Sequence, residues 1–326
     1  MVYKKKNMEE LVSIVVPVFN TKREVLKKCL ECLIDQSYQN IEIIVVDDCS
    51  NNSSIDILTS YNDKRIKVFV NEKNNGVSFC RNRGIDNSKG EYIIFIDSDD
   101  YCDKNLIKYL YEGIKKYNKD VAVPMTHRCV YFEDKLVEEI VYNIVPVNEK
   151  ITKENYFKFT RPAELYEARK LYKASLLKDV RFDTKCSYGQ TLLFNFELSK
   201  KGFTTCFIPE AIYFYNVVKN SNSGERRLNT KGWYLVEAFA KIIRSKEIRD
   251  KDAIVGLYNE FDFAFNLFYY ALARKKKIFR LFWMNRFKFI YLRRHHGLHD
   301  LLYMLFPILI VSHREKKAKK IEKILS

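Results

Sequence analysis

Short apolar runs alternate with segments of helical spacing along the first hundred residues of the chain. The apolar runs are rich in β-branched residues and stop at polar residues, which is typical of buried strands. Between them, apolar residues recur every three or four positions, as in amphipathic helices. This alternation predicts βαβ units and a largely parallel sheet, with strands over 12–20, 41–46, 66–70 and 92–96 and helices over 24–36, 55–61 and 77–87.

Polar residues at the ends of three predicted strands carry the candidate chemistry. The strands end at Phe19-Asn20, at Asp47-Asp48 and at Asp97-Ser98-Asp99. Ligands of open α/β sheets bind outside the carboxyl ends of the strands, so we expect all three ends to line one cleft. An Asp-x-Asp there can hold a hard divalent cation through oxygen atoms, and the cation can hold a diphosphate.

Each of these clusters also has an ordinary structural interpretation. The carboxylates at 47–48 could cap the following helix, and those at 97–100 could cap a turn. Arg81 and Arg83 lie near the start of the predicted helix over 77–87, where they form either a solvated basic face or a phosphate contact. A planar guanidinium suits phosphate, which favours a phosphate contact for Arg81.

Beyond residue 100 the pattern is mixed. It predicts helices over 106–117 and 192–200, a strand over 121–125, a hairpin-like excursion over 130–147 and an extended segment over 204–215. Composition shifts after the polar loop 220–224, and the remaining chain is aromatic and basic with helical spacing. The fold class is therefore α/β, with helices flanking a mixed, mostly parallel sheet in residues 1–227 and a helical extension in residues 228–326.

Composition supports a packed protein of the reducing cytoplasm. The apolar fraction of 47% favours a core over disorder, and Met1–Glu10 lacks the apolar stretch of a secretory signal. The eight cysteines lie mostly in apolar runs. Cys29 and Cys32 form a C-x-x-C without a second Cys or His pair, so we expect core thiols rather than a zinc or redox site.

The net charge of +16 is concentrated near the end of the chain. Residues 274–326 contain 15 Lys and Arg against 3 Asp and Glu, a balance of +12. Such a tail predicts an anionic partner, either a membrane surface or nucleic acid. The apolar run 301–311 is shorter than the roughly 20 residues of a spanning helix, which favours a helix lying at the membrane interface.

Other interpretations of this tail are packing against the preceding α/β domain and a contact between copies in an oligomer. We expect no nucleic-acid partner, because no recognisable nucleic-acid module accompanies the basic tail. The predicted location is the cytoplasm, peripheral at the inner face of the cell membrane.

Four ordered motifs resemble those of the family 2 inverting glycosyltransferases with a GT-A fold. They are Ser13–Asn20, Val45–Ser50, Asn75–Gly84 and Gly90–Asp100. Weaker matches continue at 170–172, 181–183 and 212–215, so the resemblance covers the chain to about residue 225. It implies metal-dependent transfer of a sugar, with inversion, from a nucleotide diphosphate donor such as a UDP-sugar. The acceptor would be a hydroxyl of a cell-surface glycan or a lipid-linked acceptor.

The resemblance also implies roles for individual residues. Asp48 would bind the base, and Asp97 would contact the ribose or a metal. Asp97 and Asp99 would ligate Mn²⁺ or Mg²⁺, which would neutralise the departing diphosphate. The nucleotide pocket as a whole would comprise Pro17, Phe19, Asn20, Asp48, Gly76, Arg81, Asp97 and Ser98.

The sequence departs from the family at the general base. An inverting transfer needs a group that takes the proton of the acceptor hydroxyl, and the family places a Glu-Asp pair at a helix start. Here Gln190 and Thr191 occupy those positions. Either another carboxylate serves, with Asp183, Glu164 and Glu167 as candidates, or the acceptor needs little base assistance. Alternatively, the chain is a catalytically impaired homologue that binds sugar nucleotides or acts as a scaffold.

A second departure is Asn216, where the family often has Arg or His before a loop that closes over the diphosphate. The missing charge could come from that loop, with Lys219, Arg226 and Arg227 as candidates. A surface loop without such a role is the other interpretation.

Overall fold

The computed structural model describes residues 9–51, 54–132, 134–142, 144, 146–159, 169–186, 189–218, 242 and 247–248. All of them belong to one compact unit, Met1–Ala264. The predicted boundary at 227/228 and the basic tail lie outside the described residues.

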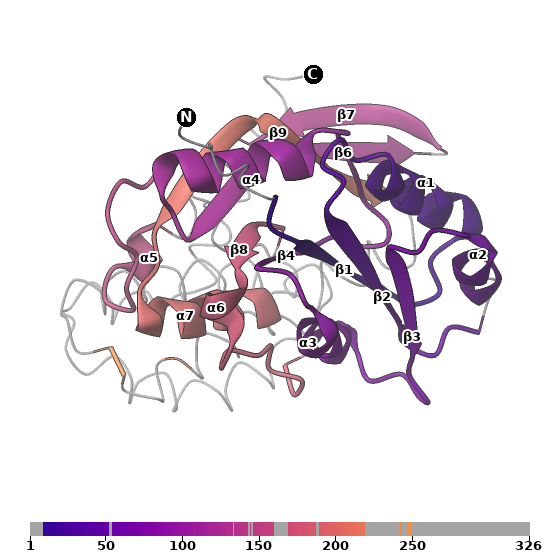
Figure 1. Ribbon diagram of the computed structural model, residues 1–326, viewed down its shortest axis with the longest axis horizontal. Helices are drawn as coiled ribbons and strands as arrows, with labels where there is room; N and C mark the ends of the chain where they lie inside the picture. The colour runs from indigo at the N-terminus through magenta and orange to yellow at the C-terminus, as the bar shows by residue number, and fades with distance from the viewer. Residues whose placement is uncertain are drawn as a thin grey trace, which may run out of the picture. The chain divides into compact units, whose positions relative to one another are not determined.

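Four parallel strands form the first half of a nine-stranded sheet. They are β1 (Val12–Val18), β2 (Ile41–Asp47), β3 (Ile66–Val70) and β4 (Tyr92–Phe95), in the spatial order β3-β2-β1-β4. The crossovers contain α1 (Arg23–Ile34), α2 (Ser54–Ser60) and α3 (Val77–Asn87). The βαβ pattern predicted from the sequence is therefore confirmed (Figure 1).

The second half of the sheet is mixed. Strand β8 (Leu171–Lys173) runs antiparallel to β4, and the order continues through β6 (Val121–Phe132), β9 (Thr205–Val218) and β5 (Tyr101–Cys102). Strand β7 (Lys135–Val141) pairs with β6. The helices of this half are α4 (Leu106–Tyr117), α5 (Tyr156–Phe159), α6 (Ala174–Leu177) and α7 (Gln190–Lys201).

The structure extends several of the predicted elements. Strand β6 continues past residue 125 to Phe132, because it pairs with β9 on one side and turns back into β7. Its register with β9 shifts after Pro124, a residue that has no backbone N–H to give to the ladder. Helix α7 begins two residues earlier than predicted, at Gln190. Strand β8 was not predicted, since three residues are too short to show a period.

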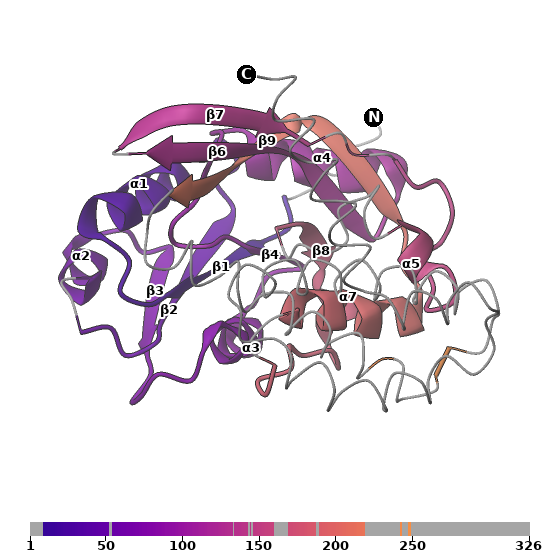
Figure 2. The same ribbon diagram turned by 180° about the vertical axis from the view of Figure 1, so that it is seen from behind.

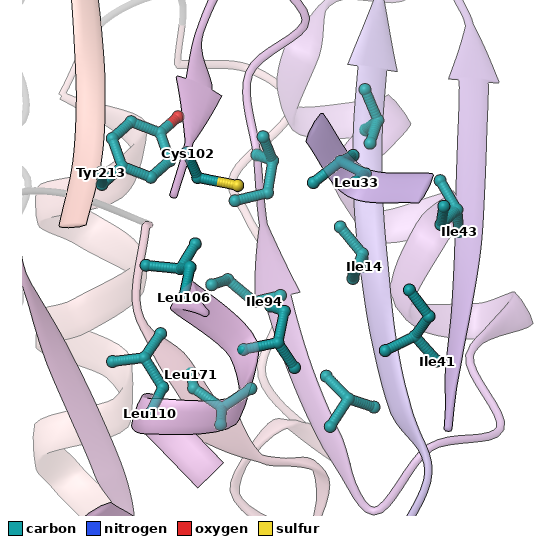
Figure 3. Packing of buried hydrophobic residues seen from close by; sticks show 14 of the residues in the cluster. Ile14, Leu33, Ile41, Ile43, Ile94, Cys102, Leu106, Leu110, Leu171 and Tyr213 are labelled. Carbon is teal, nitrogen blue, oxygen red and sulfur yellow. The ribbon is translucent and has the colours of Figure 1, made fainter. Parts of the chain in front are cut away.

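Helices cover both faces of the parallel strands. Helices α1, α2 and α4 lie on one face, and α3, α6 and α7 lie on the other (Figures 1 and 2). On the first face, Ile14, Ile43 and Ile94 belong to the main apolar cluster together with residues of α1 and α4 (Figure 3). On the second face α3 lies so close to β1 that a Cβ at Gly84 would fall 2.2 Å from the Val15 side chain.

The candidate interfacial run 301–311 lies outside the described residues, so its prediction stays untested. Within the part of the chain that the structure describes, no helix is both long enough and apolar enough to cross a membrane.

Candidate active site

The carboxyl ends of β1, β2 and β4 lie at one edge of the sheet, because the three strands are neighbours and parallel. Hydrogen bonds join the loops that follow them. The Asn20 N–H donates to Ser50 Oγ at 2.9 Å, and the Asn51 N–H donates to Asn20 Oδ1 at 2.9 Å. Thr21 Oγ1 and Ser98 Oγ lie 2.6 Å apart. The structure therefore brings together the three strand ends that the sequence predicted to form one cleft.

Residues of the β1 end differ in exposure. Pro17 is buried inside the strand, where it pairs with Val46, whereas the Phe19 side chain is 49% exposed. Asn20 has a φ of 51°, a left-handed conformation that Asn tolerates better than most residues. This turn sends the chain out of the sheet and leaves the Phe19 ring accessible at the strand end.

Asp48 is enclosed by the segment that leads into α3. Its carboxylate is 2% exposed and accepts from Asn71 Nδ2 at 2.7 Å, from Asn75 N–H at 2.9 Å and from Gly76 N–H at 2.7 Å. Gly76 has a φ of 87°, which favours glycine, and it is the residue before the first turn of α3. Asp48 thus fixes the loop between β3 and α3.

Two polar residues near Asp48 also make hydrogen bonds within the protein: Asp47 at the end of β2 and Arg83 in α3. Asp47 is fully buried and accepts from the Ser50 N–H at 3.0 Å and from Ser50 Oγ at 2.5 Å. Arg83 donates to Val70 O at 2.8 Å and to Asn71 Oδ1 at 2.5 Å. The Arg83 guanidinium therefore supports the loop after β3 and is not a solvated basic face.

Arg81 and Asp97 form an ion pair at the end of β4. Arg81 Nη2 donates to Asp97 Oδ1 at 2.7 Å, and the guanidinium lies 5.3 Å from the Phe182 ring. Arg81 is 6% exposed, whereas the Asp97 side chain is 40% exposed. A buried cation thus orients a carboxylate that remains open to solvent.

Asp99 lies beside Asp97 in the same loop and is exposed, while Ser98 between them is buried. Two accessible carboxylates provide the oxygen ligands that Mg²⁺ and Mn²⁺ prefer, usually together with substrate phosphates. Within the described ranges no three His, Cys, Asp or Glu side chains converge into a complete metal centre. This donor set fits a cation that is shared with a bound diphosphate.

A third carboxylate of the loop, Asp100, faces the interior. It is 1% exposed and accepts from Tyr213 OH at 2.7 Å and from the Asn216 N–H at 2.8 Å. Arg169 Nη1 lies 3.9 Å from its Oδ2. Burial, reinforced by Asp97 and Asp99, raises the pKa of Asp100 well above its ordinary value. Sequence reasoning missed this network because Tyr213 and Asn216 lie in β9, more than a hundred positions from the loop.

The start of α7 holds Gln190 and Thr191, as the sequence indicated, so the described part of this turn carries no carboxylate. Asp183 Oδ1 accepts from the Lys185 N–H at 2.8 Å, which closes a local turn. Glu164 and Glu167 lie outside the described residues, as do Lys219, Arg226 and Arg227. Asp183 is therefore the candidate base that lies within the described residues.

The cysteines mostly contribute to packing. Cys29, on α1, is fully buried, and burial raises its pKa well above the ordinary value. Cys32 lies with its Sγ 3.6 Å from Cys102 Sγ, and this contact lowers the Cys32 pKa. Cys29 lies in the main apolar cluster, as a core thiol should, and Cys32 is partly buried against that cluster.

The strand order β3-β2-β1-β4 of the parallel half, with helices on both faces, is that of a GT-A fold. The sequence matches the family model "Glycosyl transferase family 2" over residues 13–180, just over half of the chain. The protein belongs to this family and is a glycosyltransferase, as the four motifs predicted.

Two curated relatives come from Streptococcus pneumoniae. Glycosyltransferase GlyG is 32% identical over 252 residues, which cover 72% of this chain and 80% of GlyG. Glycosyltransferase GlyA is 31% identical over 249 residues, which cover 72% of this chain but 34% of GlyA. The chain thus corresponds to most of GlyG and to about a third of GlyA.

Among solved structures, S. aureus TarS 1–349 in complex with UDP superimposes with a TM-score of 0.58 at 21% sequence identity. The match covers 78% of this chain and 72% of the TarS chain. At this identity the likeness establishes the fold, and it confirms the predicted GT-A class.

Proposed function

We propose that the protein transfers a sugar from a nucleotide diphosphate donor, most simply a UDP-sugar, to an acceptor hydroxyl with inversion at the anomeric carbon. The observation that carries the proposal is the pair of accessible carboxylates, Asp97 and Asp99, at the carboxyl end of β4. The UDP complex of TarS, which shares the fold, supports the choice of donor. The acceptor class, a cell-surface glycan or a lipid-linked acceptor, rests on the family resemblance.

In this proposal Asp97 and Asp99 hold Mn²⁺ or Mg²⁺ together with the donor diphosphate. The cation supplies electrostatic stabilisation of the leaving diphosphate. Arg81 keeps the Asp97 carboxylate in place through their 2.7 Å ion pair. Phe19 and Asn20 border the nucleotide on the β1 side. Asp48 either contacts the base itself or holds the loop before α3, which would then enclose the base.

The acceptor proton needs a separate group. Gln190 and Thr191 cannot accept a proton near neutral pH, so a carboxylate elsewhere takes it or the acceptor reacts with little assistance. Asp183 is the described candidate, and its Oδ1 closes a turn with the Lys185 N–H. Asp183→Asn tests the role, since loss of a general base should lower turnover and leave UDP binding unchanged.

Gln190 and Thr191 also favour a second candidate function, a sugar-nucleotide-binding or scaffolding homologue with little activity of its own. Such a homologue would still bind the sugar nucleotide at Asp97 and Asp99 but would transfer the sugar slowly or not at all. Restoring Glu and Asp with Gln190→Glu and Thr191→Asp would raise turnover sharply if the missing pair is the cause.

The decisive experiment is release of UDP from a panel of UDP-sugars with Mn²⁺, with and without a membrane extract as acceptor. Acceptor-stimulated release from one donor supports the transferase and identifies its sugar. Tight binding of a UDP-sugar without release under any acceptor would instead favour the second candidate.

We also propose that the basic segment 274–326 brings the protein to the anionic inner surface of the cell membrane. Its charge of +12 supports this proposal, since such segments attract anionic lipids. Flotation with vesicles that contain anionic lipid at low salt tests it, with zwitterionic vesicles as the control. Absence of binding to the anionic vesicles would contradict it.

A further inference from the structure

Strand β9 holds the acidic loop after β4, although the two segments are distant in sequence. The Tyr213 hydroxyl donates to Asp100 Oδ2 at 2.7 Å and accepts from the Asp97 N–H at 3.4 Å. Tyr213 is fully buried and Asp100 is 1% exposed. One phenol thus joins the backbone at the start of the loop to a carboxylate at its end, and its ring lies in the apolar cluster beside Cys102 (Figure 3).

Asn216, further along β9, contacts the same loop twice. Its backbone N–H donates to Asp100 Oδ1 at 2.8 Å, and its side-chain Nδ2 donates to the Asp99 carbonyl oxygen at 2.8 Å. Each of the three loop aspartates is therefore bonded to β9, either through its backbone or through its side chain.

Asp100 has the opposite surroundings to its neighbours. Both of its oxygens accept hydrogen bonds inside the protein, and Arg169 Nη1 lies 3.9 Å away. The Arg169 guanidinium in turn lies 4.3 Å from the Tyr215 ring. A buried carboxylate is costly unless it is bonded and compensated, so this arrangement gives the loop one fixed conformation. The exposed faces of Asp97 and Asp99 depend on that conformation.

We propose that Tyr213 and Asn216 are positioning residues that act through Asp100 and the loop backbone to aim Asp97 and Asp99 at the metal and the donor. The inference rests on the proposed function, because it assumes that these carboxylates bind a cation. Groups that orient metal ligands are needed for full metal affinity, and their loss typically weakens it by about 10–100-fold.

The test is Tyr213→Phe in the full chain, with the Mn²⁺ concentration that gives half-maximal UDP binding as the readout. We expect this concentration to rise by about 10–100-fold and binding to recover at saturating Mn²⁺. The control is Tyr38→Phe, which also removes a buried tyrosine hydroxyl, one that donates to Glu10 O at 2.6 Å. If the Tyr213 hydroxyl served only the stability of the fold, Tyr213→Phe would behave like Tyr38→Phe. Both variants would then be less stable than the wild-type protein, and both would keep its Mn²⁺ dependence of UDP binding.

Asn216→Ala tests the same role if Tyr213→Phe does not fold, because it removes only the side-chain bond to Asp99. A smaller rise in the Mn²⁺ requirement is expected. Wild-type Mn²⁺ dependence in the folded variants would overturn the positioning role while leaving the proposed function intact. If the wild-type protein itself showed no Mn²⁺-dependent UDP binding, the proposed metal site would be wrong, and the positioning role with it.

Discussion

Two acidic strand ends lie at the same edge of the sheet, but their carboxylates have opposite surroundings. At the end of β2, Asp48 is 2% exposed and accepts three hydrogen bonds from Asn71, Asn75 and Gly76. At the end of β4, the Asp97 side chain is 40% exposed and Asp99 is exposed. The same sequence pattern, an apolar run that stops at carboxylates, therefore produces a buried loop anchor in one place and solvent-exposed carboxylates in the other.

The difference comes from what each strand meets in three dimensions. The segment after β3 folds over the end of β2 and brings two backbone N–H groups to Asp48. The loop after β4 is bonded instead from the β9 side, through Asp100, so Asp97 and Asp99 remain accessible. The difference in burial thus distinguishes Asp48, which organises the fold, from Asp97 and Asp99, which are accessible from solvent.

The largest expected effect belongs to the open end. Asp99→Asn removes a charged ligand from the proposed metal site, and we expect donor turnover to fall by about 10²-fold or more. Glu112→Gln is the matched control, because it makes the same change at an exposed position on α4 and should leave turnover unchanged. Comparable turnover in the two variants would remove the distinction between the two strand ends.

The closed end should respond in stability. Asp48→Asn places an amide against two backbone N–H donors, and we expect the free energy of unfolding to fall by about 1–3 kcal/mol. Asp99→Asn, at an exposed site, should change it by less than about 0.5 kcal/mol. Urea unfolding of both variants provides the measurement. Equal losses would show that Asp99 is as much a part of the fold as Asp48.

A smaller effect is expected at the ion pair that orients Asp97. Arg81→Lys keeps the charge but loses the planar guanidinium that lies over Phe182, so UDP affinity with Mn²⁺ should fall by about tenfold, or about 1.4 kcal/mol. Arg181→Lys makes the same change at an exposed ion pair with Asp86 and should leave the UDP affinity measured with Mn²⁺ unchanged. Unchanged UDP affinity in Arg81→Lys would argue against a role for the Arg81–Asp97 pair.

The smallest effect concerns the contact between the β1 and β4 loops. Thr21→Val removes the hydroxyl that lies 2.6 Å from Ser98 Oγ while keeping the shape of the side chain. We expect a loss of about 1 kcal/mol in unfolding free energy. Thr184→Val, at an exposed position, is the control. Identical urea midpoints for the two variants would show that the loops are held together without this contact.

The meeting of three polar strand ends could be predicted from sequence because it depends on local patterns. Each apolar run ends where its strand leaves the core, so the residues at 19–20, 47–48 and 97–99 could be assigned to one cleft from the order of residues alone. The sequence could not distinguish Asp48 from Asp99, since the groups that enclose Asp48 arrive from the segment after β3. The roles of Tyr213 and Asn216 were equally hidden, because they depend on pairing between β9 and a loop far away in the chain.

The second half of the sheet was harder to predict for a related reason. Strands β5 and β8 contain two and three residues, too few for a hydrophobic period, and they exist because neighbouring strands supply their hydrogen bonds. For the general base, the sequence showed only that Gln190 and Thr191 stand where the family has a Glu-Asp pair. An absent motif excludes one base without identifying another.

Calorimetric titration of UDP with and without Mn²⁺, in the wild-type protein and in Asp99→Asn, tests the central claim most directly. If the open carboxylates at the end of β4 share a cation with the donor diphosphate, Mn²⁺ will strengthen UDP binding to the wild-type protein by at least about tenfold, or about 1.4 kcal/mol, and will not do so in the variant. Undiminished Mn²⁺-dependent UDP binding in Asp99→Asn would contradict the account.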